Sequence, residues 1–182
     1  MIIAIGLLEF NSISQGIKVA DIMKKAADVE IIMAQPTCPG KYTVLISGSV
    51  SAVNASVESG VDSSGPFLVD HMVISRIHHQ LLSAMNGTTE IGDVNAVGVL
   101  EYFSVASAIV GADAAVKSAE IDLMQVRLAT GLGGKAYVTF SGDVGAVKQA
   151  LEAGAAANEN NGMLYNKILI SSPDKDLFKT LL

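Results

Sequence analysis

The chain has 182 residues, of which 50% are hydrophobic and 16% are charged, with a formal net charge of −6 and a single cysteine. The acidic charge, without any basic cluster, argues against a nucleic-acid partner. No apolar run approaches the roughly 20 residues that span a bilayer, so we expect no membrane partner. One cysteine excludes an internal disulfide framework and suits a reducing cytoplasm. A mean hydropathy of +0.44 with so few charges predicts a surface that other subunits partly cover.

The first half of the chain alternates predicted strands and helices. Residues 2–10 are apolar and follow no basic segment, so they are predicted to form a buried strand rather than a signal peptide. Ser12 can then cap a helix with one apolar face. The residues expected on that face are Ile13, Ile17, Ala20, Met23 and Ala27. Residues 29–34 and 42–47 are predicted strands on either side of a Pro- and Gly-containing loop at 35–40.

The next predicted elements complete the first half of the chain. Ser49 can cap a second helix, and Asp143 occupies the matching place in the second half of the chain. Residues 67–75 are predicted to form the last strand of this half and residues 78–85 a short helix. Residues 86–92 are predicted to be a linker.

The same order of elements recurs because residues 4–60 are repeated at 96–154, with two additional residues in the second copy at the loop that holds Cys38 in the first. A repeat this long predicts two complete small domains, which we expect at 1–90 and 91–182. The order β-α-β-β-α-β predicts an α/β (α+β) fold of two tandem ferredoxin-like domains. Each is expected to be an antiparallel sheet with helices on one face.

Several strings of the second copy resemble the shell-protein (BMC) domain of bacterial microcompartments. They are Ala96-Val-Gly-Val-Leu-Glu101, residues 113–119 and residues 142–154, and the resemblance covers nearly the whole chain twice. It implies a structural shell protein rather than an enzyme, located in the microcompartment shell in the cytoplasm, with other BMC shell proteins as partners. The tandem arrangement is similar to that of members that form pseudohexameric homotrimers.

The loop Cys38-Pro-Gly-Lys41 is similar to that of tandem shell proteins from propanediol-utilisation compartments. The resemblance implies that one cysteine per subunit binds an iron–sulfur cluster on the threefold axis, for electron transport to an encapsulated or cytosolic redox protein. Iron–sulfur clusters are usually held by four thiolates. We expect one [4Fe–4S] cluster per trimer. Three thiolates would leave one of its irons to bind water or an outside ligand. Alternatively, three thiolates would suit a three-iron cluster.

A lone cysteine is most often a small buried apolar residue. Here Pro36, Pro39 and Gly40 disfavour a helix or a central strand, so Cys38 is predicted to lie on a tight turn. The alternative to a cluster is an unligated Cys38 in a purely architectural or metabolite-pore shell subunit.

In the second copy the matching loop contains three glycines and no cysteine. Gly131, Gly133 and Gly134 precede Lys135, but Ala136 follows the lysine, so the run is not a phosphate-binding P-loop. The glycines are predicted to let backbones crowd together without side-chain clashes. The resemblance implies a central position for this loop and for the Cys38 loop, which contributes Pro39, Gly40 and Lys41.

Two lysines recur four residues after an aspartate. Lys25 follows Asp21 and Lys117 follows Asp113, so each is predicted to form an intrahelical ion pair. The resemblance implies that both lysines lie at the edge where shell tiles meet, with Arg76 as a further edge residue. The second copy departs from the family pattern at the position matching Arg76.

The three histidines have no counterpart in the second copy. His71 lies in a predicted strand, and His78 and His79 are adjacent, so structural roles are favoured over a metal or acid–base site. We find no nucleophile motif and no paired carboxylates with a base. An enzymatic or ligand-binding role is therefore the least favoured hypothesis, since fold alone does not determine function.

Overall fold

The computed structural model describes residues 4–90, 94–174 and 176. Residues 2 and 3 of the first predicted strand, and residues 91 and 92 of the predicted linker, lie outside this part. The first copy contains β1 (Ala4–Phe10), α1 (Ile13–Ala26), β2 (Val29–Thr37), β3 (Lys41–Gly48), α2 (Val50–Ser64), the 3₁₀ helix η1 (Gly65–Phe67) and β4 (Leu68–Ile74). All neighbouring strands are antiparallel, in the order β2-β3-β1-β4.

The second copy repeats this arrangement in a sheet of its own. It contains β5 (Ala96–Tyr102), α4 (Val105–Ser118), β6 (Ile121–Leu128), β7 (Ala136–Gly142), α5 (Val144–Ala156), η2 (Glu159–Asn161) and β8 (Leu164–Ile170). The strand order β6-β7-β5-β8 is again antiparallel throughout. In each βαβ unit a strand of the other unit lies between the two parallel strands, so the predicted ferredoxin-like fold is confirmed in both copies.

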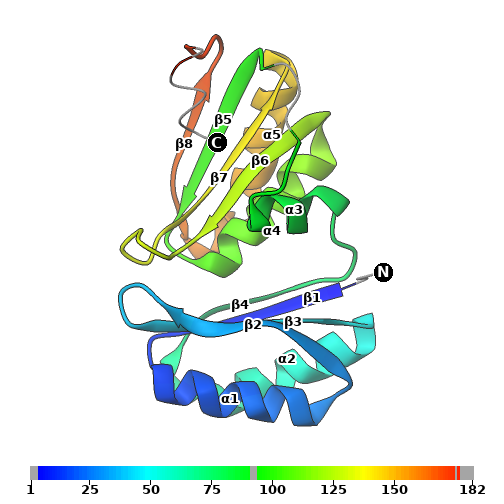
Figure 1. The fold of residues 1–182 in the computed structure, drawn as a ribbon, viewed down its shortest axis with the longest axis vertical. Coiled ribbons are helices and arrows are strands. Elements are labelled where there is room, and N and C mark those ends of the chain that lie inside the picture. Colours follow the sequence, from blue (N-terminus) through cyan, green and yellow to red (C-terminus); the bar gives the residue numbers. More distant parts are fainter. Residues whose placement is uncertain (1–3, 91–93, 175, 177–182) are drawn as a thin grey trace. The chain divides into compact units, whose positions relative to one another are not determined.

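Helices cover one face of the first sheet. In Figure 1, α1 and α2 lie side by side under the sheet that contains β1 and β3. The core between these layers includes Leu8, Met23 and Ile46, all fully buried. Gly60 lets α2 approach β1 closely, because a Cβ there would lie 2.8 Å from Leu8 Cδ2. Its counterpart Gly154 approaches Leu100 in the second copy in the same way.

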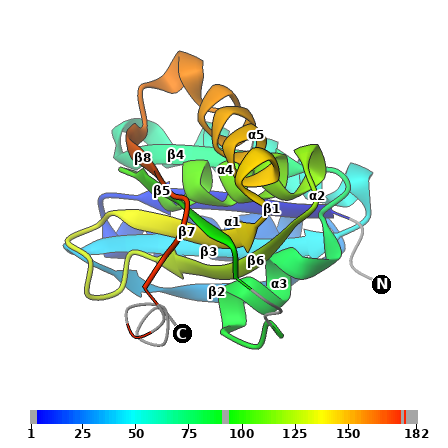
Figure 2. The same ribbon diagram turned by 90° about the horizontal axis from the view of Figure 1, so that it is seen from above.

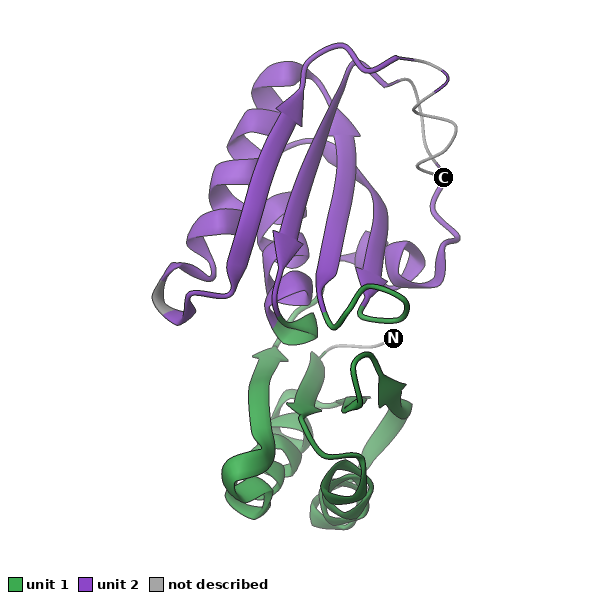
Figure 3. Ribbon diagram, turned by 90° about the vertical axis from the view of Figure 1, so that its left-hand side faces the viewer, with its two compact units in different colours: residues 1–77, 104–106, 129–134 green, residues 78–103, 107–128, 135–182 purple. Residues whose placement is uncertain are grey.

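The chain forms two compact units that do not follow the repeat boundary (Figure 3). Unit 1 contains the described residues up to Ile77 together with 104–106 and 129–134 of the second copy. Unit 2 contains the other described residues, including α3 (His79–Asn86). Although α3 follows the first copy in sequence, it packs beside β6, as Figure 2 shows. The proposed domain boundary between residues 90 and 91 stays a prediction.

The predicted serine caps are present. Ser12 Oγ accepts the Gln15 N–H, and Ser49 Oγ accepts the Ala52 N–H. The prediction for Asp143 was wrong in part: it occupies the N-cap position of α5 but makes no capping bond, because its Oδ1 accepts the Asn95 side-chain amide instead.

The predicted apolar face of α1 was also wrong in part. Ala20 and Met23 are buried, but Ile13 is 39% and Ile17 55% exposed. The core instead receives Gly16 and Val19, because α1 is turned so that these residues face the sheet and α2. Two isoleucines therefore remain uncovered on the outer side of α1. In the described part of the chain, no helix is long and apolar enough to cross a membrane.

Candidate functional site in the central loops

The Cys38 loop is a tight turn between β2 and β3. The Cys38–Pro39 peptide bond is cis, Gly40 has φ +89°, and the Gly40 N–H donates to the Thr37 carbonyl at 3.1 Å. Cys38 itself is half-buried. The prediction of a turn at Cys38 is thus confirmed. β2 runs on to Thr37, further than the predicted 29–34, and it accommodates Pro36 because it is an edge strand.

The glycine loop of the second copy lies against the Cys38 loop within unit 1. Ala129, Gly131, Gly133 and Gly134 all have positive φ. A Cβ on Gly134 would lie 2.7 Å from Pro39 Cδ and 3.0 Å from the Cys38 carbonyl oxygen. The close approach of the two backbones therefore requires glycine at Gly134, whereas a Cβ at Gly131 or Gly133 would meet no atom within 4 Å.

The donor set of one chain is too small for an iron–sulfur cluster. Cys38 is the only cysteine, and among the described residues no three His, Cys, Asp or Glu side chains gather in a way that could hold a metal ion. A cluster needs three or four thiolates. The half-buried thiol fits the predicted role only if Cys38 residues from several chains meet, and the loop position on a turn is compatible with that.

The two loop lysines point away from the turns into ion pairs. Lys41 Nζ lies 2.8 Å from Glu9 Oε1, with Lys41 17% and Glu9 0% exposed. In the second copy Lys135 pairs with Glu101, and its Nζ also lies 4.4 Å from the centroid of the Tyr165 ring. Neither ammonium group is therefore a free cation, and each is held by a glutamate on the first strand of its own sheet.

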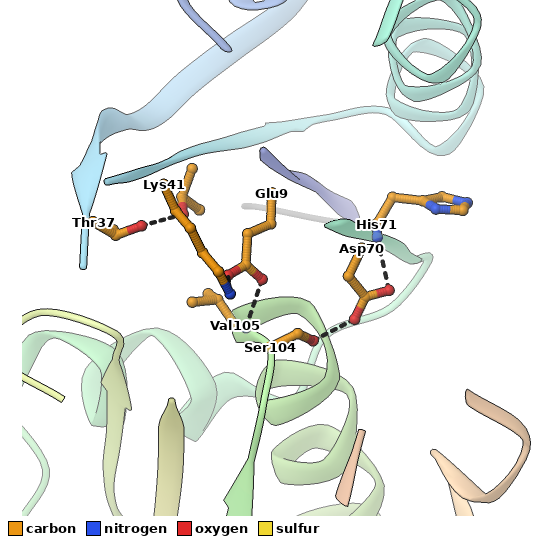
Figure 4. A network of polar contacts seen from close by, with 8 residues as sticks. Glu9, Thr37, Lys41, Asp70, His71, Ser104 and Val105 are labelled. Atoms are coloured by element: carbon orange, nitrogen blue, oxygen red, sulfur yellow. Dashed lines mark hydrogen bonds and ion pairs between the residues drawn. The ribbon is translucent and has the colours of Figure 1, made fainter. Parts of the chain in front are cut away.

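Glu9 is the centre of a polar network in unit 1 that the sequence analysis did not identify (Figure 4). Its Oε2 accepts the N–H of Val105, the first residue of α4, at 2.9 Å. Burial raises the pKa of Glu9 above its usual value, although the bonds from Lys41 and Val105 oppose the rise. The signal in the sequence was a glutamate recurring at the end of two otherwise apolar strands, as Glu9 and Glu101.

A second contact of the same network joins Asp70 to the residue before α4. Asp70 Oδ2 accepts from Ser104 Oγ, and Asp70 Oδ1 accepts the His71 N–H at 2.9 Å (Figure 4). Nearby, the Thr37 and Thr43 hydroxyl groups share a hydrogen bond of 3.2 Å. Glu9 and Asp70 thus bind the backbone and side chain at the start of one helix.

The edge residues stand outside this network. The predicted ion pairs are present, with Lys25 Nζ 2.6 Å from Asp21 and Lys117 Nζ 2.5 Å from Asp113. Arg76 is exposed after β4. The assignment of these residues to a tile edge stays a prediction.

The histidines have local contacts. His78 Nδ1 accepts the Gln80 N–H at the start of α3, and burial lowers the pKa of His78. His71 lies in β4, and its backbone N–H donates to Asp70. These contacts agree with the structural roles that the sequence favoured.

Comparison with known proteins identifies similar chains over the full length. The BMC domain family matches residues 4–77 and 96–173. The bacterial microcompartment shell protein PduT of Citrobacter freundii is 35% identical over 178 residues, which is 98% of this chain and 97% of PduT. The carboxysome assembly protein CcmO of Synechococcus elongatus is 29% identical over 98% of this chain and 68% of CcmO.

Two solved structures share the fold. The crystal structure of a microcompartment protein from Desulfitobacterium hafniense DCB has a TM-score of 0.84 and 43% identity, covering 97% of this chain and 98% of that chain. A fused permuted hexameric shell protein of the RMM microcompartment has a TM-score of 0.63 at 23% identity, covering 84% and 79%. The second likeness concerns the fold alone.

Proposed function

Because this chain belongs to the family of BMC-domain shell proteins, we propose that three copies form one tile whose Cys38 thiolates together hold an iron–sulfur cluster. The chain is a structural shell protein of a bacterial microcompartment related to PduT, not an enzyme. Its place is accordingly the shell of a compartment that resides in the cytoplasm, among other BMC shell proteins.

The need for several chains rests on the donor set. One half-buried thiol on a turn, with no metal-binding group of three side chains elsewhere in the described residues, can hold a cluster only by sharing it. Exposed large apolar side chains support assembly as well, because contact with another chain would remove their apolar surface from water. They include Ile13, Ile17, Ile31, Ile32, Phe103, Tyr165 and Ile168.

Four residues of the central loops have a defined part in this proposal. Cys38 supplies one thiolate, and a bound [4Fe–4S] cluster would supply one-electron transfer across the shell to a redox protein. Gly134 leaves room for Pro39 and for the Cys38 backbone, which holds the turn against the glycine loop. Lys41 and Lys135 remain bound to Glu9 and Glu101 and do not serve as ligands.

The second candidate is an architectural or metabolite-pore subunit with an unligated Cys38. The observation that favours it is the absence of any further cysteine beside Cys38. Under this candidate the tile assembles through the same surfaces and contains no iron.

The deciding experiment measures iron, acid-labile sulfide and visible absorbance in protein purified without oxygen, together with its oligomeric mass. We expect about four iron atoms per three chains, or three for a three-iron cluster, and the loss of all three signals in Cys38→Ser with the trimer retained. A wild-type trimer that stays colourless and iron-free after anaerobic reconstitution would establish the second candidate instead.

A further inference from the structure

The network around Glu9 shows how the first copy binds the start of a helix from the second. Glu9 accepts the N–H of Val105 at 2.9 Å, and Asp70 accepts from the hydroxyl of Ser104. Lys41 neutralises Glu9, and Val105 is 0% exposed. A carboxylate is favoured here because the first N–H groups of a helix lack intrahelical acceptors and carry partial positive charge.

Because the sequence is repeated, each of the two sides of this contact, the carboxylate and the helix start, has a counterpart elsewhere in the chain. Glu101 and Lys135 match Glu9 and Lys41, but they are 29% and 38% exposed instead of 0% and 17%. The helix that matches α4 is α1, whose first residue Ile13 is 39% exposed. Within the described residues, no acceptor binds the Ile13 N–H. One binding site and one helix start therefore remain unused on each chain.

The position of Asp70 in this contact also has a counterpart in the second copy. Asn166 occupies the position opposite Glu101 that Asp70 occupies opposite Glu9. Its Oδ1 accepts the N–H of Lys167 at 2.9 Å, as Asp70 Oδ1 accepts that of His71. The Asn166 side chain is thus held in the same way through its Oδ1.

We propose that Glu101 and Asn166 of one chain bind the start of α1 in a second copy of this chain. Glu101 accepts the Ile13 N–H of that copy, and Asn166 Nδ2 donates to its Ser12 Oγ. The inference rests on the proposed assembly into a trimer and names the residues that join its subunits.

The chemistry of the two surfaces is complementary. The positive end of α1 meets a carboxylate, and Ile13 and Ile17, exposed in one chain, gain a surface that covers them. On the partner side, Phe103 and Tyr165 form an edge-to-face pair with ring centroids 5.0 Å apart beside Lys135. Such aromatic side chains are typical of interface centres.

The contact is head-to-tail, because each chain offers one helix start and one receiving site. A head-to-tail interface generates either a closed ring or an open filament, according to the rotation that it imposes. Closure into a ring of three would occupy every helix start and every receiving site and leave the predicted edge residues available to meet other tiles.

Cross-linking between cysteines tests the contact directly. Ser12→Cys with Asn166→Cys, in a Cys38→Ser background, should give covalent dimers and trimers with a short bismaleimide. The matched control is Ser104→Cys with Asp70→Cys in the same background, which should link within one chain and leave the mass on denaturing gels unchanged. Each single-cysteine variant should stay uncross-linked.

A charge reversal gives the second measurement. Glu101→Lys places an ammonium at the helix start, and we expect the concentration at which trimers dissociate to rise about 30-fold or more. As a control, Glu152→Lys reverses the charge of an exposed residue of the same unit that pairs with Lys167. It should leave the concentration at which trimers dissociate unchanged.

The outcomes separate this inference from the cluster. Cross-links between residues 12 and 166 in the Cys38→Ser background, together with wild-type trimers that stay iron-free after anaerobic reconstitution, support the contact and overturn the cluster. Wild-type trimers that hold iron, with no cross-link between residues 12 and 166 in the Cys38→Ser background, overturn the contact alone. Protein that is monomeric at every concentration overturns the contact together with the trimer.

Discussion

The close packing of Gly134 against the Cys38 turn predicts a large effect of one added methyl group. Gly134 has φ +88°, and a Cβ there would lie 2.7 Å from Pro39 Cδ and 3.0 Å from the Cys38 carbonyl oxygen. The left-handed backbone costs a non-glycine residue roughly 1–2 kcal/mol. Forcing extra volume into a packed contact costs roughly 1–3 kcal/mol more. Gly134→Ala should therefore lower the free energy of unfolding by about 2–5 kcal/mol.

Gly131→Ala is the matched control for this substitution. Gly131 has φ +75°, but a Cβ there would meet no atom within 4 Å. It should lose only the backbone contribution, about 1–2 kcal/mol. Urea unfolding followed by circular dichroism compares the two variants with the wild type. Labelling of the Cys38 thiol should also become faster in Gly134→Ala, because the displaced turn exposes it. Equal unfolding midpoints and equal labelling rates in the two variants would refute the proposed contact.

Two further predictions concern charge. Burial raises the pKa of Glu9 above the usual 4.5, so the stability that protonation provides is complete below pH 4.5 and is lost as the pH rises through the raised pKa. In Glu9→Gln the urea midpoint should not show this decrease with rising pH. If the midpoints of the variant and the wild type change in parallel from pH 4 to 8, the buried carboxylate is contradicted. Lys25→Asp with Lys117→Asp should abolish extended sheets in electron micrographs while the trimer mass is unchanged; normal sheets would show that these exposed ion-paired lysines do not join tiles.

The local elements could be predicted because they depend on short-range patterns. The Ser12 and Ser49 caps, the turn at Cys38 and the spacing of Asp21 and Lys25 all involve residues within a few positions of one another. The ferredoxin-like strand order followed from the sequence of strands and helices in each copy. These inferences needed no knowledge of distant contacts.

The exposed face of α1 could not be predicted from such local patterns. Ile13 and Ile17 have the helical spacing of a buried stripe, yet both are exposed in one chain. Periodicity identifies an apolar face but not the surface that covers it. Under the inference above, that surface belongs to another copy. The apolar composition of the chain had indicated covered surfaces without locating them.

The sequence by itself determined the duplication, the fold of each copy and the single thiol on a turn, because repetition, periodicity and turn chemistry are local properties. Only the tertiary structure decided that Gly134 touches the Cys38 turn and that Glu9 receives the start of α4. Residues 9 and 105 are far apart in sequence, and no spacing rule relates them. Their contact depends on how the chain folds back on itself, where the helix N-terminus and Lys41 favour a carboxylate that burial opposes.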